Sequence, residues 1–189
     1  PIFVDTAQAL TTGIAKLASC RAGGIAVALT GKLDSGEAFS GTVAIGNDTP
    51  FEPDAHSRFQ AGTLAAVFTT LLYAEARSKG LVKADDPVSK YLPADVSVPS
   101  FFEKGQAVAI RIGQLATHTS GLPRAAGTAR YPYRVAEMHA DLAKVTLARA
   151  PGTKWEYSNL GIALLAEAME TIFKAPIDKL IAEHVSTPL

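Results

Sequence analysis

The sequence is short of the residues from which several kinds of site are built. Cys20 is the only cysteine, so the chain has neither an internal disulfide nor a zinc site made of several cysteines. The four histidines are scattered through the sequence without the spacing of metal ligands. We therefore expect neither a metal ion nor a cofactor.

An excess of charge and long apolar runs are also missing. The 18 basic residues balance the 18 acidic ones and form no stripe, which predicts no nucleic-acid partner. The apolar stretches are broken before the roughly 18 residues that a membrane span needs, and we expect a soluble protein without a membrane span. The N-terminus has no signal pattern, but an exported protein that had lost its signal would look the same. The sequence therefore does not decide between a periplasmic or secreted location and a cytoplasmic one.

What the sequence does have is the composition of a globular protein. Of its 189 residues 48% are hydrophobic and 19% are charged, which favours one domain, over residues 1–189, with a buried core. Apolar residues at intervals of three and four predict a helix over residues 4–19. Two short runs, 24–29 and 39–45, are separated by a turn-rich stretch and predict a β-hairpin.

Helices dominate the rest of the predicted structure. Four further segments have the apolar spacing of helices: 59–80, 134–147, 160–173 and 176–185. Thr63 is placed to cap the first of them and Gly80 to end it, while Ser158 is placed to cap the third. The region between the first and second of these helices is rich in loops. The fold class that this predicts is α+β, with two strands and about five helices.

Four stretches carry a resemblance to a known superfamily. In order they are RFQAGTLAAVFTTLL, GLVKADDPVSKYLP, IRIGQLATHTSGLP and PGTKWEYSNLGIALLAEAME, and with the chain end they cover residues 58–189. They resemble serine β-lactamases and penicillin-binding proteins, particularly class C β-lactamases, family VIII esterases and D-aminopeptidase-like proteins. The resemblance implies the helical region and N-terminal strands of the β-lactamase/transpeptidase-like fold. It also implies that the antiparallel sheet is incomplete in this chain, which lacks the C-terminal strands.

By this resemblance, the first stretch is where the superfamily carries S-x-x-K. The serine lies at a helix N-terminus, and the lysine one turn later, on the same face, helps to remove its proton. In this sequence Thr63 stands at the serine position and Ala66 at the lysine position. Threonine keeps a hydroxyl with a crowding methyl group, whereas alanine keeps no group that can accept a proton. Since S-x-x-K occurs nowhere else in the sequence, we expect background rates of catalysis.

The second motif of the superfamily is intact. Tyr157, Ser158 and Asn159 match Y-x-N, and by resemblance Tyr157 is a general base or acid and Asn159 a donor to the substrate amide. Without an ammonium group, neither Thr63 nor Tyr157 is expected to have a neighbouring positive charge. The resemblance makes His118 a structural turn residue that forms hydrogen bonds. The third motif, K-T-G or H-x-G, is not in this chain.

Three hypotheses follow, and whether the chain is an enzyme stays open. The first is a catalytically degenerate homologue whose cleft around Tyr157 and Asn159 binds a small ester, amide or peptide-like ligand. The second is an active esterase, peptidase or β-lactamase that a C-terminal half or a second chain completes. The third is a structural or assembly module that forms homo-oligomers through an open sheet edge.

Overall fold

The computed structural model describes residues 12–13, 24–32, 35–46, 56–125, 127 and 134–188. The chain divides into two compact units, residues 1–60 and 61–189, and each is described here by itself. That residues 1–189 form a single domain stays a prediction.

The first unit contains the predicted hairpin. Strands β1 (Gly24–Lys32) and β2 (Ala38–Gly46) pair antiparallel, with Gly24 opposite Gly46 and Lys32 opposite Ala38. In the turn between them, Gly36 has a φ of 86°, a conformation that glycine adopts without steric cost. The predicted helix over residues 4–19 lies outside the described residues except at residues 12–13, which are helical.

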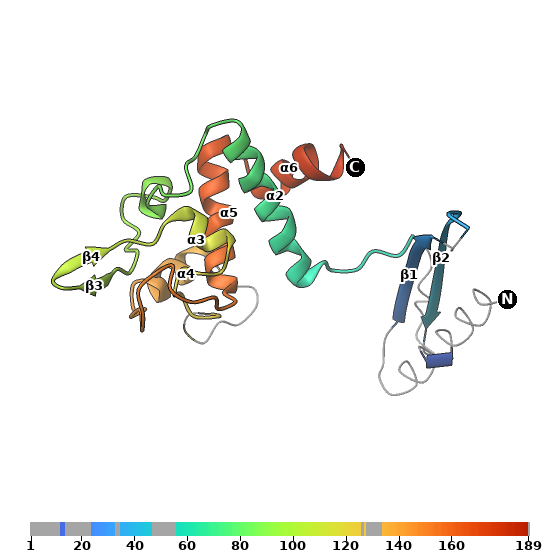
Figure 1. Cartoon of the computed structure of the whole chain (residues 1–189), viewed down its shortest axis with the longest axis horizontal. Helices are drawn as coiled ribbons and strands as arrows, with labels where there is room; N and C mark the ends of the chain where they lie inside the picture. Colours follow the sequence, from blue (N-terminus) through green and yellow to red (C-terminus); the bar gives the residue numbers. More distant parts are fainter. Residues whose placement is uncertain are drawn as a thin grey trace. The chain divides into compact units, whose positions relative to one another are not determined.

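The second unit is built around helices α2 (Ala65–Ser78) and α5 (Asn159–Phe173), which pack side by side (Figure 1). The buried residues of each helix recur at intervals of three and four, so that one face of the helix enters the core. They are Thr69, Leu72, Tyr73 and Ala76 on α2, and Leu160, Gly161, Leu164, Leu165, Ala168 and Met169 on α5. Both helices were predicted, and both are confirmed.

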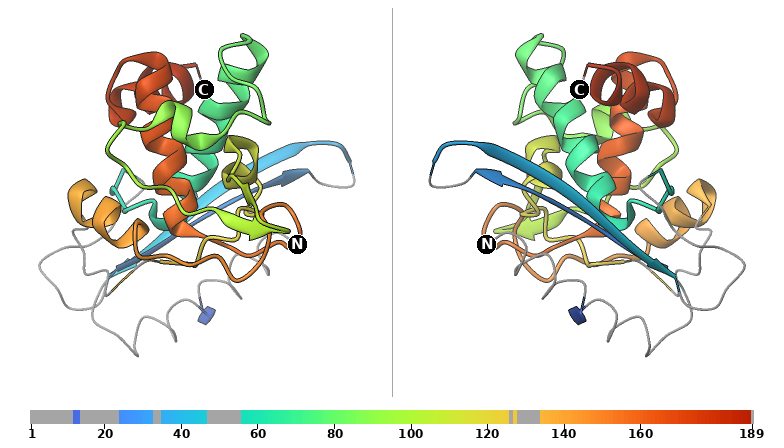
Figure 2. Two further views of the ribbon diagram at one scale, coloured as in Figure 1. Left: turned by 90° about the vertical axis from the view of Figure 1, so that its left-hand side faces the viewer. Right: turned by 90° about the vertical axis from the view of Figure 1, so that its right-hand side faces the viewer.

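The two main helices end where the local sequence dictates. Gly80 has a φ of 69°, and the Leu81 amide donates to the Ala76 carbonyl at 2.9 Å, which closes the C-terminus of α2. Lys174 ends α5 in the left-handed region, at a φ of 57°. After Pro176 the chain turns into α6 (Ile177–Ile181) and a π-helical turn (Ala182–Ser186), which pack against α2 (Figure 2).

The remaining elements are short and lie between α2 and α5 in the sequence. A 3₁₀ turn (Val88–Tyr91) leads to strands β3 (Phe101–Glu103) and β4 (Gln106–Val108), a small antiparallel hairpin that the sequence did not predict. Helix α3 (Ile112–Ala116) packs against α5, and α4 (Val135–Leu142) confirms the helix expected within residues 134–147. His139 of α4 bonds the Glu167 carboxylate of α5 at 2.9 Å.

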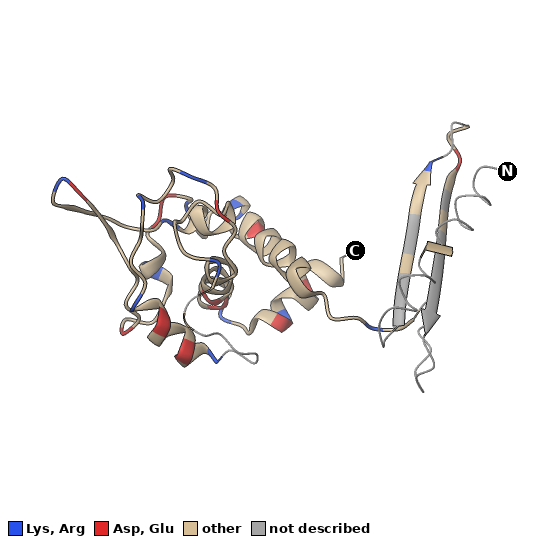
Figure 3. Ribbon diagram, turned by 90° about the horizontal axis from the view of Figure 1, so that it is seen from below, with Lys and Arg blue, Asp and Glu red and all other residues tan. Residues whose placement is uncertain are grey.

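The helices and small antiparallel sheets confirm the α+β class. Basic and acidic residues are interspersed over the described part of residues 61–189 (Figure 3). Among the helices of the described residues, none has the length and apolarity that a membrane crossing requires.

Candidate active site

The Thr63 hydroxyl stands at the start of the central helix. A 3₁₀ turn (Gly62–Leu64) precedes α2, and Gly62 enters it with a φ of 54°. Neither this turn nor α2 has a side-chain cap, so the prediction that Thr63 caps the helix is wrong. Within the described residues the Thr63 hydroxyl makes no hydrogen bond. Ala66 lies three residues after Thr63, and its side chain is only a methyl group.

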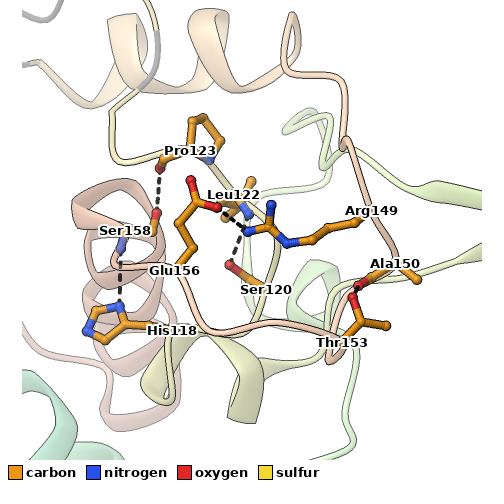
Figure 4. A network of polar contacts seen from close by, with 9 residues as sticks. All are labelled: His118, Ser120, Leu122, Pro123, Arg149, Ala150, Thr153, Glu156 and Ser158. Atoms are coloured by element: carbon orange, nitrogen blue, oxygen red, sulfur yellow. Dashed lines mark hydrogen bonds and ion pairs between the residues drawn. The ribbon is translucent and has the colours of Figure 1, made fainter.

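The other side of the site is a turn, residues 118–124, held against the loop that precedes α5 (residues 149–158). Four backbone bonds tie the turn to this loop and to the first residues of α5. They are Gly152 N–H to the Thr119 carbonyl (2.7 Å), Glu156 N–H to the His118 carbonyl (2.8 Å), and Asn159 and Leu160 N–H to the Arg124 carbonyl (3.0 and 3.4 Å). The Arg149 guanidinium also pairs with the Glu156 carboxylate inside the same loop (Figure 4). These ties fix the positions of both segments.

Ser158 joins the turn to the helix with a single hydroxyl. Its Oγ accepts the Gly161 N–H at 2.9 Å, which caps α5, and donates to the Pro123 carbonyl at 2.7 Å (Figure 4). Only 1% of Ser158 is exposed. The predicted cap is therefore confirmed, and the same hydroxyl fastens the 118–124 turn to the helix.

His118 has a backbone conformation that few non-glycine residues adopt. Its φ is 55°, in the left-handed region, which non-glycine residues rarely adopt outside constrained sites. Its Nδ1 accepts the Ser158 N–H at 3.3 Å, so a neutral ring carries its proton on Nε2. Burial lowers the pKa of His118, which keeps the ring neutral near pH 7. The hydrogen-bonding role expected for this residue is confirmed.

Tyr157 lies within a row of rings. The centroids of the His118 and Tyr157 rings are 4.4 Å apart. The Trp155 ring meets the His118 ring edge-on, with the centroids 6.2 Å apart. On Tyr157 itself lies the guanidinium of Arg124, with Cζ 5.4 Å from the ring centroid. The expectation that Tyr157 has no neighbouring positive charge is therefore wrong, because an arginine that the sequence analysis overlooked supplies one.

His118, Arg124 and Tyr157 help to line an open pocket of about 420 Å³ in the second unit. It is lined by Thr63, Ala66, Val67, Thr70, Ala116, His118, Arg124, Tyr157 and Ile162. The Thr70 hydroxyl donates back to the Ala66 carbonyl of its own helix. The pocket therefore combines an apolar wall with hydroxyl, imidazole and guanidinium donors.

The structure brings together two of the three predicted site residues, Thr63 and Tyr157. Asn159 does not line this pocket; it is exposed at the first position of α5, with its backbone N–H bonded to the turn. Arg124 was missed, although it directly follows the S-G-L-P stretch. Among the described residues, no three metal-binding side chains gather in one place.

The chain is similar to part of several named proteins and solved structures. AmpH of Escherichia coli, named a D-alanyl-D-alanine-carboxypeptidase/endopeptidase, is 33% identical over 143 residues, which are 72% of this chain and 36% of AmpH. A β-lactamase/D-alanine carboxypeptidase of Yersinia pestis superposes with a TM-score of 0.68 at 27% identity, covering 87% of this chain and 47% of that one. The chain thus spans about a third to a half of the length of these relatives.

The fold is shared with more distant proteins as well. An octameric penicillin-binding protein homologue from Pyrococcus abyssi superposes with a TM-score of 0.74 at 21% identity, covering 97% of this chain and 43% of that one. This likeness confirms that the chain has part of the β-lactamase/transpeptidase-like fold. The sequence pattern of the Beta-lactamase family matches residues 13–189, nearly the whole chain, and this protein therefore belongs to that family.

Proposed function

We propose that this chain is a catalytically degenerate member of its family, whose pocket beside Tyr157 holds a ligand without hydrolysing it. The observation that carries the proposal is the alanine methyl of Ala66 in the pocket wall, where the family pattern has a lysine. An alcohol is a poor nucleophile until a base is aligned on it. The Thr63 hydroxyl makes no hydrogen bond to any described residue, so none of those residues is aligned to take its proton.

Arg124 does not replace the missing base. A guanidinium stays protonated at every pH that a folded protein experiences, so it can stabilise an anion but cannot accept a proton. The loss of members of a hydrolase catalytic unit lowers kcat by ~10⁴-fold or more. We therefore expect hydrolysis at the rate of the uncatalysed reaction, with the binding pocket intact.

Acylation assays test this proposal directly. The purified chain is incubated with nitrocefin, p-nitrophenyl butyrate and a fluorescent penicillin, while rates and intact mass are followed. We expect rates equal to those without protein, and no covalent adduct. An acyl group mapped to Thr63 of the unaltered chain would contradict the proposal.

Restoring the family pattern supplies the matched variants. The double variant Thr63→Ser/Ala66→Lys regains both the nucleophile and the base, and we expect it to form an acyl adduct. Thr63→Ser alone regains an unhindered hydroxyl without a base and is expected to stay unlabelled. If the double variant also stays unlabelled, the substituted pair is not the sole reason for inactivity.

The alternative is an active esterase, peptidase or β-lactamase that uses Thr63 as its nucleophile. Its support is that Thr63 keeps a hydroxyl in the same pocket as Tyr157, and that the relatives are longer than this chain. AmpH is named a carboxypeptidase and endopeptidase, so a peptide-like compound is the substrate to try first. Release of D-alanine from a peptide that ends in D-alanyl-D-alanine would favour this alternative.

A further inference from the structure

The pocket lining that the structure describes carries hydrogen-bond donors of several kinds and no acidic group. The described lining residues include hydroxyls, an imidazole and a guanidinium, but no carboxylate. Arg124 has no acidic partner among the residues that the structure describes, whereas Arg149 in the neighbouring loop is paired with Glu156. A cation that lines a concave site without a counter-ion favours an anionic ligand.

The geometry of Arg124 favours one kind of anion. Its backbone is fixed, because the Arg124 carbonyl accepts the Asn159 N–H at 3.0 Å. The Tyr157 ring, 5.4 Å from its guanidinium carbon, gives the side chain a platform on one face. The edge of a guanidinium presents two parallel N–H groups, whose spacing matches the two oxygens of a carboxylate. Tyr157 and His118 also line the pocket, and each carries a further donor, the phenol hydroxyl and the Nε2–H of the neutral ring.

Apart from the hydroxyl of Thr63, the remainder of the pocket is largely apolar. Ala66, Val67, Ala116 and Ile162 contribute only hydrocarbon, and the hydroxyl of Thr70 is engaged by its own helix. The substitution at position 66 is part of this wall, since a lysine there would bring a second cation and fill space with its long stem. A ligand that pairs with the Arg124 guanidinium and also packs against the apolar wall must carry an anionic group and a hydrocarbon part.

We propose that the pocket binds an apolar monocarboxylate, with the carboxylate on Arg124 and the hydrocarbon against the wall that begins at Ala66. The inference rests on the proposed ligand-binding function and names the ligand class of that site. It differs from the binding of a neutral ester or amide, for which an unpaired guanidinium offers no advantage. The positive charge of this pocket is on an arginine, which does not lose its proton, whereas the family pattern has a lysine, which can exchange one.

The chain carries its own probe for a binding experiment. Trp155 is the only tryptophan, 63% of it is exposed, and its ring meets His118, which lines the pocket. Hexanoate is titrated into the full chain while tryptophan fluorescence and the heat of binding are recorded. Methyl hexanoate has the same hydrocarbon without the charge, and acetate and inorganic phosphate have the charge without the hydrocarbon. We expect saturable binding of hexanoate and at least tenfold weaker binding of the other three.

Variants of Arg124 test which group recognises the charge. Arg124→Gln is expected to weaken hexanoate binding about 10- to 100-fold, the range for a charge-assisted hydrogen bond, and Arg124→Lys to weaken it less. The matched control is Arg77→Gln, which removes an arginine that also lies over a tyrosine ring, Tyr73, at 5.9 Å, outside the pocket. This control is expected to bind hexanoate as the unaltered chain does. Urea unfolding of each variant confirms that its fold is unchanged.

The outcomes separate this inference from the proposed function. Equal binding of hexanoate and its methyl ester, equal binding by Arg124→Gln, or no binding at all would overturn the inference. Tight binding of acetate or phosphate alone would also overturn it, because the apolar wall would then contribute nothing. None of these results bears on catalytic degeneracy, which fails only if the unaltered chain is acylated at Thr63.

Discussion

Removal of the Ser158 hydroxyl is the most informative single change for the integrity of the site. Ser158→Ala deletes one oxygen that accepts the Gly161 N–H at 2.9 Å and donates to the Pro123 carbonyl at 2.7 Å. Loss of an N-cap costs about 1 kcal/mol, and the partly buried Pro123 carbonyl left without its donor costs about 1–2 kcal/mol more. We therefore expect the free energy of unfolding to fall by about 2–3 kcal/mol.

The assay for this variant is urea unfolding followed by the fluorescence of Trp155, which lies in the same unit. With an m value of about 2 kcal/mol/M, the loss corresponds to a midpoint about 1–1.5 M lower. Ser78→Ala is the matched control, because its hydroxyl donates to the Glu75 carbonyl at an exposed position, and we expect a change below about 0.5 kcal/mol. Equal effects of the two substitutions would refute the argument that Ser158 fastens the turn to α5.

Two further predictions concern the loops around the core. Hydrogen bonds from the Tyr91 hydroxyl and the Lys83 N–H lower the pKa of Asp86 from 3.8 to about 2. Its stabilising contribution is therefore complete above pH 3.8 and lost as the pH falls towards 2, and stability measured against pH should fall less steeply in Asp86→Asn. Gly121 has a φ of 79°, and a Cβ there would lie 3.3 Å from the Arg149 carbonyl oxygen. Gly121→Ala should therefore lower the free energy of unfolding by about 1–3 kcal/mol, and a urea midpoint equal to that of the unaltered chain would contradict this.

The parts of the fold that follow from local chemistry were predictable. Helix α5 has a regular apolar spacing and a serine at its N-terminus, and Gly80 permits the backbone that ends α2. The β3–β4 hairpin was missed because each strand has only three residues, too few for alternation to appear. Its turn uses Lys104 and Gly105, both with positive φ, and a lysine is not a usual signal for that conformation.

The site was predictable only in part, for a related reason. The motif Tyr157-Ser158-Asn159 is contiguous and can be recognised in the sequence, whereas the cap expected at Thr63 depended on where the helix begins. Gly62 directs the chain into a 3₁₀ turn first, so Thr63 lies within that turn and not at the boundary of α2. Arg124 could not be placed from the sequence, because its position over Tyr157 depends on bonds between segments about 30 residues apart.

Residues 63 and 66 lie outside the core face of the central helix, where a substitution disturbs the packing least. The buried face of this helix is formed by Thr69, Leu72, Tyr73 and Ala76, whereas Thr63 and Ala66 lie outside that set and line the pocket. A substitution at either position is therefore expected to leave the core packing unchanged, and an alanine at position 66 avoids the cost of placing an ammonium group in the half-buried pocket wall. Restoring the lysine by Ala66→Lys would place an ammonium group in a pocket that already holds the Arg124 guanidinium. Repulsion between the two cations would ease proton loss from the ammonium, as a general base requires, while it weakened the fold.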